Sequence, residues 1–331
     1  MTGAQRFWAG LVLVVALAVT VIHVVRDLGG VLANEPGHEL RREPSPDSNQ
    51  PFPRSVTDDY GNLATIPVPP RRIVSSELTV DEILFDLIDP ERIVAVSRFS
   101  FERRYSSLAE RVTMLDLPSS ESAEVVLSLR PDLVIAGSHV RAEWLDLLGR
   151  GGVPVYRLEH NIAKLSQING LIRRIGYLTG SDDRARELAE MFQGRIERAL
   201  NRRARHDTSH PRILGYDRGL ASSYGINTLF HDVVTILGGI NIGAERGLDT
   251  YDGISFEQVA DWNPDWIVTG ADPGRHEALR QALLMNPGVA ATSAARNGQL
   301  LILPQQVFLS MSHNVIELVE SLAAALYPEG A

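Results

Sequence analysis

Several short apolar segments of this sequence are followed directly by side chains that recognise charged or metal-containing molecules. Arginine offers planar hydrogen-bond donors that match carboxylate and phosphate groups, whereas histidine and tyrosine ligate iron and other transition metals. Phenylalanine beside them would supply an apolar wall. The candidate ligand-binding residues are Arg98, Phe99, His139, His160, Tyr216, Arg218, Phe308 and His313. Within this set, His139 and His313 are the candidate metal ligands.

Each candidate also has an ordinary structural explanation. Arg98 and Arg218 have carboxylates close by in the sequence, at Glu102 and Asp217, with which they would form ion pairs. A single histidine is more often a surface or capping residue than a ligand. The residue types therefore leave two chemistries open. Arginines would bind an anionic chelate, whereas histidines or tyrosine would bind haem iron or a bare metal.

Catalytic and nucleic-acid-binding functions find little support in this sequence. It has no GxxxxGK[ST] phosphate loop, no GxGxxG after a strand, no GxSxG elbow and no HExxH. It has no cysteine, which excludes disulfides, zinc-thiolate sites and cysteine nucleophiles. Its net charge of -9 argues against binding to a phosphate backbone, which needs clustered lysine and arginine. The absence of these motifs does not by itself exclude an enzyme, but no motif predicts one, and we expect neither catalysis nor a resident cofactor.

The candidate residues fall where a parallel sheet would bring them together. The segments before them are short and rich in valine and isoleucine, which is typical of strands covered on both faces. We predict strands at residues 72–75, 92–97, 132–136, 153–158, 212–216, 266–269 and 300–303, and helices at residues 79–87, 228–237, 275–285 and 312–326. Thr79 and Glu82 have the spacing of a capping box at the start of the first helix. In α/β sheets of this kind, ligands bind beyond the carboxyl ends of the strands.

The middle of the chain has no strand pattern. Residues 161–205 are predicted to be helical, with one interruption at residues 179–182. Gly180 suits the C-cap of one helix, and Ser181 suits the N-cap of the next. The predicted layout is a lobe, a long helical connector and a second lobe.

Two segments on either side of this connector repeat one pattern. Residues 122–137 (SAEVVLSLRPDLVIAG) and 255–270 (SFEQVADWNPDWIVTG) align without a gap and are identical at six positions. The identical pairs are Ser122/Ser255, Glu124/Glu257, Val126/Val259, Pro131/Pro264, Asp132/Asp265 and Gly137/Gly270. Each segment predicts a serine-capped short helix, a proline that ends it and a buried strand. We infer that both lobes contain the same α/β unit.

With these features the sequence resembles the periplasmic binding proteins for vitamin B12, ferric siderophores and haem. The resemblance covers residues 71–328 and is carried by the order of its segments, among them RIVSSELTVDEILFDLIDPERIVAVS, GYLTGSDDRARELAEMF, NTLFHDVVTILGGINI and the two repeats. It implies an α/β fold with two Rossmann-like lobes joined by a long rigid helix and a ligand between the lobes. It also implies the extracytoplasmic solute-binding component of an ABC importer. Such a protein captures an iron complex (ferric siderophore or haem) or cobalamin and delivers it to a membrane permease with ATPase subunits.

The same resemblance gives the paired glutamates of the repeat a role. In this family one acidic residue on the outer surface of each lobe docks on permease arginines, and Glu124 and Glu257 occupy the matching motifs. A glutamate in the first turn of a helix is exposed, and two charges at a fixed separation set the orientation of an encounter. The alternative is that both glutamates only complement their helix dipoles.

The N-terminus indicates export. Residues 7–25 form an almost unbroken apolar run, and a helix needs roughly 20 such residues to cross a bilayer. We expect an uncleaved anchor that tethers a periplasmic protein to the inner membrane; cleavage of a signal peptide near residues 31–33, followed by secretion, is the alternative. The predicted organisation is an anchor or signal at residues 1–28, a flexible proline-rich tether at 29–65, an N-terminal lobe at 66–160, connecting helices at 161–208 and a C-terminal lobe at 209–331.

The expected anchor keeps other functions open. A membrane-tethered metal- or haem-binding sensor or adaptor would keep the binding fold without feeding a transporter. A metal-handling enzyme is a further alternative, because related folds include chelatases. An adjacent permease and ATPase gene would favour transport, a neighbouring signalling protein would favour sensing, and turnover of a bound tetrapyrrole would favour the enzyme.

Overall fold

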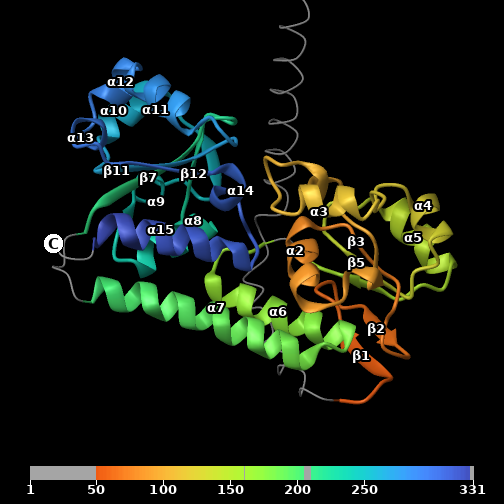
Figure 1. The fold of residues 1–331 in the computed structure, drawn as a ribbon. Coiled ribbons are helices and arrows are strands. Elements are labelled where there is room, and N and C mark those ends of the chain that lie inside the picture. The colour runs from red at the N-terminus through yellow and green to blue at the C-terminus, as the bar shows by residue number, and fades with distance from the viewer. Residues whose placement is uncertain (1–49, 160, 205–209, 329–331) are drawn as a thin grey trace, which may run out of the picture. The chain divides into compact units, whose positions relative to one another are not determined.

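The computed structural model describes residues 50–159, 161–204 and 210–328, and they form two α/β lobes on a helical connector (Figure 1). The predicted anchor at residues 7–25 lies outside the described residues. Among the helices that are described, none is both long and apolar enough to span a membrane.

The first lobe is built on a parallel sheet in the order β4-β3-β5-β6. Its strands are β3 (Ile73–Ser75), β4 (Ile93–Ala95), β5 (Leu133–Ala136) and β6 (Val155–Arg157). Its helices are α2 (Leu78–Leu87), η1 (Pro90–Arg92), η2 (Arg98–Phe101), α3 (Ala109–Met114), α4 (Ala123–Ser128) and α5 (Ala142–Arg150). Val134 at the centre of β5 lies opposite Val74 of β3 and Val155 of β6. The four strands predicted for this lobe are therefore confirmed, each within two residues at either end.

The second lobe has a mixed sheet in the order β10-β8-β7-β11-β12, with β9 also paired to β7. Its strands are β7 (Arg212–Asp217), β8 (Ser222–Tyr224), β9 (Ile240–Asn241), β10 (Tyr251–Gly253), β11 (Trp266–Ala271) and β12 (Leu300–Pro304). Its helices are α8 (Leu229–Ile236), α9 (Ile242–Glu245), α10 (Phe256–Trp262), α11 (His276–Leu284), α12 (Pro287–Ala290), α13 (Ser293–Arg296), α14 (Gln305–Phe308), η3 (His313–Val315) and α15 (Ile316–Leu326). The sequence pattern does not predict the antiparallel strands β8 and β10, which extend one side of this sheet.

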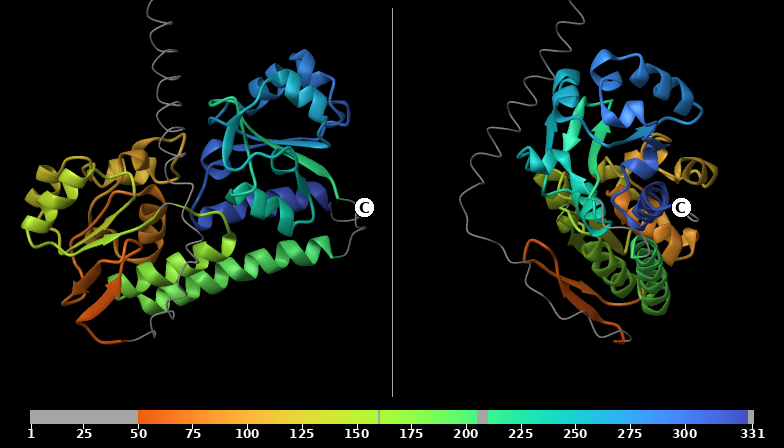
Figure 2. Two further views of the ribbon diagram at one scale, coloured as in Figure 1. Left: turned by 180° about the vertical axis from the view of Figure 1, so that it is seen from behind. Right: turned by 90° about the vertical axis from the view of Figure 1, so that its left-hand side faces the viewer.

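The connector consists of two helices, α6 (Leu165–Thr179) and α7 (Asp182–Arg203). Gly180 between them has a φ of 72°, a left-handed conformation that glycine adopts without strain, and this confirms the predicted C-cap. Helix α7 packs against α2 of the first lobe and against α15 of the second. Figures 1 and 2 show α7 running beneath both lobes, so one continuous helix connects them.

The sequence repeat is also a structural repeat. Ser122 caps α4 and Ser255 caps α10, and each hydroxyl accepts the backbone N–H three residues ahead. After these helices, Arg130 and Asn263 both adopt left-handed backbone conformations, with φ of 48° and 44°. Equivalent positions of the two halves therefore turn the chain in the same way from helix into strand.

The aspartates of the repeat fix the following strand to its neighbour in both lobes. The carboxylate of Asp132 accepts the backbone N–H of Arg72 at 2.8 Å, and that of Asp265 accepts the backbone N–H of Arg212 at 2.8 Å. Each aspartate N–H in turn donates to the carbonyl of the same arginine. The inference that both lobes contain one α/β unit is confirmed.

A β-hairpin precedes the first lobe and corrects one prediction. Strands β1 (Arg54–Thr57) and β2 (Leu63–Ile66) pair in antiparallel fashion, so the flexible tether predicted through residue 65 is wrong for this stretch. The hairpin is ordered because Val56, Ala64 and Ile66 alternate along it and are buried. Each strand has only four residues, and polar residues alternate with the apolar ones. Such a short alternating pattern is too weak to predict a hairpin from the sequence.

The predicted capping box at the start of α2 is also wrong. The helix begins at Leu78, one residue earlier than predicted, with Glu77 in the N-cap position. Glu82 therefore does not reach back to Thr79. Its carboxylate instead accepts hydrogen bonds from Ser107 of the same lobe and from Ser312 of the second lobe. A polar contact between the lobes has taken the place of a local cap.

Candidate functional site

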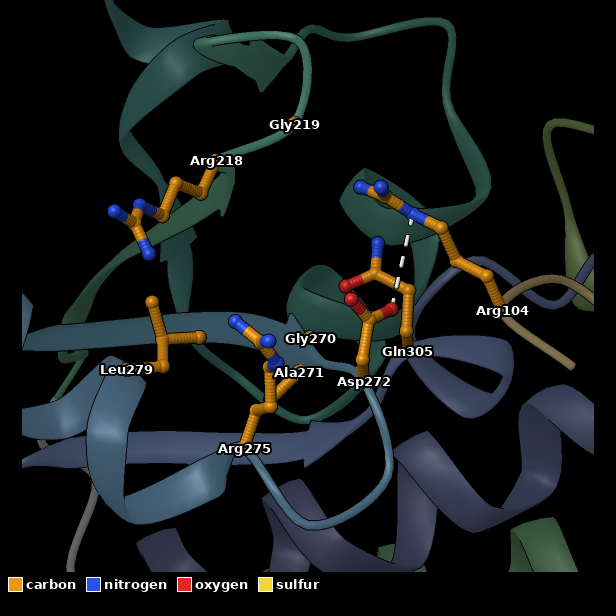
Figure 3. Close-up of a pocket in the computed structure, with 9 residues that line it drawn as sticks. All are labelled: Arg104, Arg218, Gly219, Gly270, Ala271, Asp272, Arg275, Leu279 and Gln305. Atoms are coloured by element: carbon orange, nitrogen blue, oxygen red, sulfur yellow. Dashed lines mark ion pairs between the residues drawn. The ribbon is translucent and has the colours of Figure 1, made fainter.

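A cavity of about 240 Å³ lies between the lobes, at the ends of strands β7, β11 and β12. Figure 3 shows the side chains that surround it. The lining residues are Arg104, Arg218, Gly219, Gly270, Ala271, Asp272, Arg275, Leu279 and Gln305. Arg104 comes from the first lobe and the others from the second, so the walls of the cavity belong to both lobes.

Three guanidinium groups dominate this arginine cavity. Arg218 and Arg275 line one side of the space, with the guanidinium of Arg218 above Leu279, and Arg104 reaches in from the other side (Figure 3). The Nε of Arg104 lies 4.0 Å from Oδ1 of Asp272, which is a loose ion pair across the two lobes. Among the described residues that line the cavity, Asp272 is the single carboxylate. Three positive charges against one negative charge make the cavity a site for an anionic group.

The loop that carries Arg104 is held from behind by a buried carboxylate. Oδ2 of Asp81 accepts the backbone N–H of Ser97 at 2.8 Å and the hydroxyl of Ser100 at 2.6 Å. Burial raises the pKa of Asp81 well above its usual range. These bonds fix the first turn of the loop between β4 and α3 and thereby position the arginine that follows it.

Glycines leave room for the polar side chains of the site. A Cβ at Gly219 would overlap the guanidinium of Arg104, and a Cβ at Gly270 would lie 2.6 Å from Oε1 of Gln305. Gly270 is one half of a repeated pair, and its counterpart Gly137 similarly faces a carboxylate oxygen of Glu77. The last glycine of each repeat therefore keeps the end of its strand open.

His139 lies at the end of β5, where it pairs with a carboxylate and not with other histidines. Its Nδ1 is 3.4 Å from Oε2 of Glu77, and half of its side chain is exposed. The hydrogen bond to Glu77 is the main reason that the pKa of His139 is raised. No group of three histidine, aspartate or glutamate side chains within the described residues is placed to hold a metal ion.

Arg98 and Phe99 form a small cluster on η2, in which Arg98 is exposed and Phe99 is half-buried. Arg98 lies 3.5 Å from Glu121, which is the ion-pair partner in place of the Glu102 considered from the sequence, and 4.6 Å from the ring of Phe99. Phe99 makes an edge contact with Tyr105, whose ring centroid is 5.9 Å away. These side chains sit on the same loop as Arg104, but they do not line the arginine cavity.

Tyr216 and His313 are both buried away from the arginine cavity. Tyr216 points to the layer of α10, with its ring 5.7 Å from Phe256, and burial is the main cause of its raised pKa. Nε2 of His313 lies 2.7 Å from Oδ2 of Asp86 on α2, so it contributes to the contact between the lobes. Phe308 lines a separate cavity in the second lobe. His160 lies outside the described residues.

Glu124 and Glu257 have the same environment in the two lobes. Each is exposed in the first turn of its helix. For each, a hydrogen bond from the N-cap serine is the first cause that lowers the pKa. The two glutamates are therefore equivalent negative points on equivalent helices.

Sequence reasoning missed Arg104 and Arg275. Neither follows a strand directly, because Arg104 lies beyond η2 and Arg275 stands at the start of α11. The loops after β4 and β11, examined over their full length, would have included both residues. The sequence did not show that these loops turn back toward the same cavity.

Two α/β lobes on a helical connector, with a cavity whose walls come from both lobes, define a two-lobed solute-binding protein. Residues 73–307 match the family described as periplasmic binding protein, and this chain belongs to that family. A cobalamin-binding protein of Halobacterium salinarum is 28% identical over 290 residues, which are 86% of this chain and 73% of that relative.

Solved structures of similar proteins agree with this family and fold. The apo form of the periplasmic heme-binding protein RhuT from Roseiflexus sp. RS-1 has a TM-score of 0.64 and 28% identity, and covers 78% of this chain and 98% of its own. A periplasmic heme-binding protein from Pseudomonas aeruginosa has a TM-score of 0.64 and 25% identity, over 79% of this chain and 94% of its own. The predicted fold class and the prediction of a solute-binding component of an ABC importer, and not an enzyme, are confirmed.

Proposed function

We propose that this protein binds a metal tetrapyrrole, haem or cobalamin, in the arginine cavity between its lobes. The observation that carries this proposal is that Arg104, Arg218 and Arg275 line one cavity. Haem carries two carboxylates on one edge, and guanidinium groups bind carboxylates through paired, charge-assisted hydrogen bonds. A cavity of about 240 Å³ has room for these side groups but not for a whole macrocycle. The ring would therefore lie in the cleft with one edge inserted.

The charge of the cavity favours haem over cobalamin. Cobalamin offers mostly neutral amides and a single phosphodiester, which would use fewer of the three arginines. The structural relatives from Roseiflexus and Pseudomonas are described as heme-binding. Cobalamin is the second candidate, because the relative from Halobacterium is described as cobalamin-binding.

Titration of the full chain in detergent micelles with haem and with cobalamin, followed by absorbance, tests the proposal. Arg218→Gln and Arg275→Gln each remove one charge from the cavity. A hydrogen bond to a charged group contributes about 1.5–3 kcal/mol, so the Kd for haem should rise at least about tenfold. Arg246→Gln is the matched control, since Arg246 is exposed on the same lobe outside the cavity. Unchanged haem affinity in both cavity variants would refute the role of the arginines.

The first lobe would contribute the other wall of the cleft. We propose that Arg98, Phe99 and His139 contact the solute there, because they follow the ends of β4 and β5, which is the ligand-binding edge of a parallel sheet. The protonated form that the Glu77 carboxylate stabilises on His139 would then face an anionic group.

Delivery to the transporter would use the repeated glutamates. We propose that Glu124 and Glu257 dock on cationic side chains of the permease, and their matched exposure on equivalent helices supports this. We further propose that residues 7–25 tether the protein to the membrane, which rests on their apolar sequence alone.

A further inference from the structure

A second cavity, of about 180 Å³, lies within the second lobe and is separate from the arginine cavity. Four aromatic side chains, one carboxylate and two serine hydroxyls characterise its lining. They are Tyr224, Phe230, Tyr251, Phe308, Asp217, Ser222 and Ser310, and we call this space the aromatic cavity. Leu220 at its edge is 73% exposed, so the cavity is open to solvent.

The two cavities share the end of strand β7. Arg218 lines the arginine cavity, whereas its neighbour Asp217 lines the aromatic cavity. Successive residues of a strand point to opposite faces, so β7 and the turn after it separate two spaces of opposite charge. Helix α14 also borders both, through Gln305 on one side and Phe308 on the other. A solute held in one cavity is therefore close to the other.

The ring of Tyr224 packs against the other three, in a tilted contact with Phe230 and in edge contacts with Tyr251 and Phe308. The ring of Tyr224 lies 5.1 Å from Phe230, 5.3 Å from Tyr251 and 5.4 Å from Phe308 by centroid distance. Aromatic faces carry partial negative charge, which attracts a cation or the positive end of an N–H bond. The rings therefore make the wall both apolar and receptive to nitrogen donors.

Two polar groups of the aromatic cavity, Asp217 and Ser222, can accept further hydrogen bonds, whereas the hydroxyl of Ser310 is already within hydrogen-bond distance of Ser312. Asp217 is 4% exposed, and its Oδ1 accepts the backbone N–H of Gly219 at 2.7 Å. Asp217 has no ion-pair partner among the residues that the structure describes. The hydroxyl of Ser222 is buried and has no hydrogen-bond partner within the described chain. A buried polar group that is left unsatisfied destabilises the protein, so a ligand that supplies its hydrogen-bond partner is favoured.

We propose that the aromatic cavity is a second subsite, which takes an N–H donor carried at the end of a compact apolar stem. The stem packs among the four rings, and the donor, an ammonium or a primary amide, hydrogen-bonds to Asp217 and Ser222. A carboxylate is excluded by the charge of Asp217. This inference rests on the proposed function only in so far as both cavities would hold parts of one solute.

The methionines of the chain offer a direct readout. Met311 lines the aromatic cavity, whereas Met114, Met191 and Met285 are exposed elsewhere. We would label the full chain with methyl-¹³C methionine and titrate it with benzylammonium, phenylacetamide or phenylacetate. The first two probes should shift the Met311 methyl resonance through their ring currents and leave the three exposed methionines in place. A Met311→Leu variant assigns the resonance.

Two variants test whether the probes bind through hydrogen bonds to Asp217 and Ser222 or only through apolar contacts with the rings. Asp217→Asn keeps an oxygen for the Gly219 N–H but removes the charge, so it should weaken benzylammonium at least tenfold and change phenylacetamide less than threefold. Ser222→Ala should weaken phenylacetamide. Asp261→Asn, an exposed change on α10 of the same lobe, is the control and should change neither affinity.

Three outcomes would overturn the inference. They are an unmoved Met311 resonance with all probes, phenylacetate binding as well as benzylammonium, or equal benzylammonium affinity in Asp217→Asn and the unaltered protein. None of these readouts involves a tetrapyrrole. Failure of haem and cobalamin to bind would therefore count against the proposed function and leave the subsite standing, and the reverse holds as well.

Discussion

Arg54 fastens the N-terminal hairpin to the connector, and replacing it should destabilise the fold strongly. Its guanidinium lies 2.8 Å from Asp182 at the start of α7 and donates to the carbonyl of Tyr177 at 2.6 Å. The two charged side chains are only 5% and 9% exposed. The ring of Phe52 stacks on the guanidinium from 4.5 Å. Arg54→Met keeps most of this packing and removes the charge.

The expected loss of stability comes from the Asp182 carboxylate, which stays buried after Arg54 is replaced. Without Arg54, the Asp182 carboxylate is a buried charge without its partner, and removing one partner of a buried ion pair costs about 3–5 kcal/mol. With a denaturant slope of about 1–3 kcal/mol/M, the urea midpoint should fall by at least about 1 M. Adding Asp182→Asn to Arg54→Met should recover part of the loss, because the unpaired charge is then gone.

Urea unfolding followed by tryptophan fluorescence measures these differences. Arg186→Met is the matched control, since its ion pair with Asp183 is in the first turn of the same helix but 39% and 71% exposed. Such exposed pairs contribute about 0.2–1 kcal/mol. The ion pair would not stabilise the fold as expected if Arg54→Met lowered the free energy of unfolding no more than Arg186→Met. The same would follow if the loss in the double variant equalled the sum of the losses in its two single variants.

Three further predictions concern the site and its surroundings. Glu124→Arg combined with Glu257→Arg should abolish uptake of the solute in cells while the Kd stays within twofold; normal uptake would argue against docking. His139, whose pKa the Glu77 hydrogen bond raises, should contribute stability below about pH 6.5 that is lost as the pH rises through its folded value. Because half of the side chain is exposed, the difference from His139→Gln in urea unfolding should stay below about 1 kcal/mol, and an advantage that grows toward high pH would contradict it. Gly270→Ala places a methyl 2.6 Å from Oε1 of Gln305 on α14 and should lower the free energy of unfolding by about 1–3 kcal/mol in the same assay. An unchanged free energy of unfolding would show that α14 can shift to make room for the methyl.

The repeat was the most informative part of the sequence, because its residues act locally. Ser122 and Ser255 cap the helices that directly follow them, so their roles could be predicted from spacing. The buried strands were equally clear, because a short run of valine and isoleucine is typical of a strand that is covered on both faces. Hairpin β1–β2 was missed because its short strands give a weak pattern and because the ion pair that fastens it joins Arg54 to Asp182, which is far away in the sequence.

The site was predicted less well, because long-range contacts decide which side chains meet. Arg218 was found because it follows β7 directly, and strand alternation explains why Asp217 serves a different cavity. Arg104 depends on the loop that Asp81 holds in place, and no local pattern shows that bond. His313 was expected at the cleft and lies in the contact between the lobes, because Asp86 on α2 offers a partner there.

If the solute binds in the arginine cavity as proposed, the loose ion pair between Arg104 and Asp272 would change when the protein is loaded. At 4.0 Å the two groups are held near each other without a tight bond, so an incoming anion can take over the guanidinium at small electrostatic cost. Because α7 and the Glu82–Ser312 hydrogen bond already join the lobes, arrival of the cargo would change the partner of one arginine more than the distance between the halves. A transporter that distinguishes full from empty carriers would then sense a local rearrangement of charge at the mouth of the cleft and not a large closing motion.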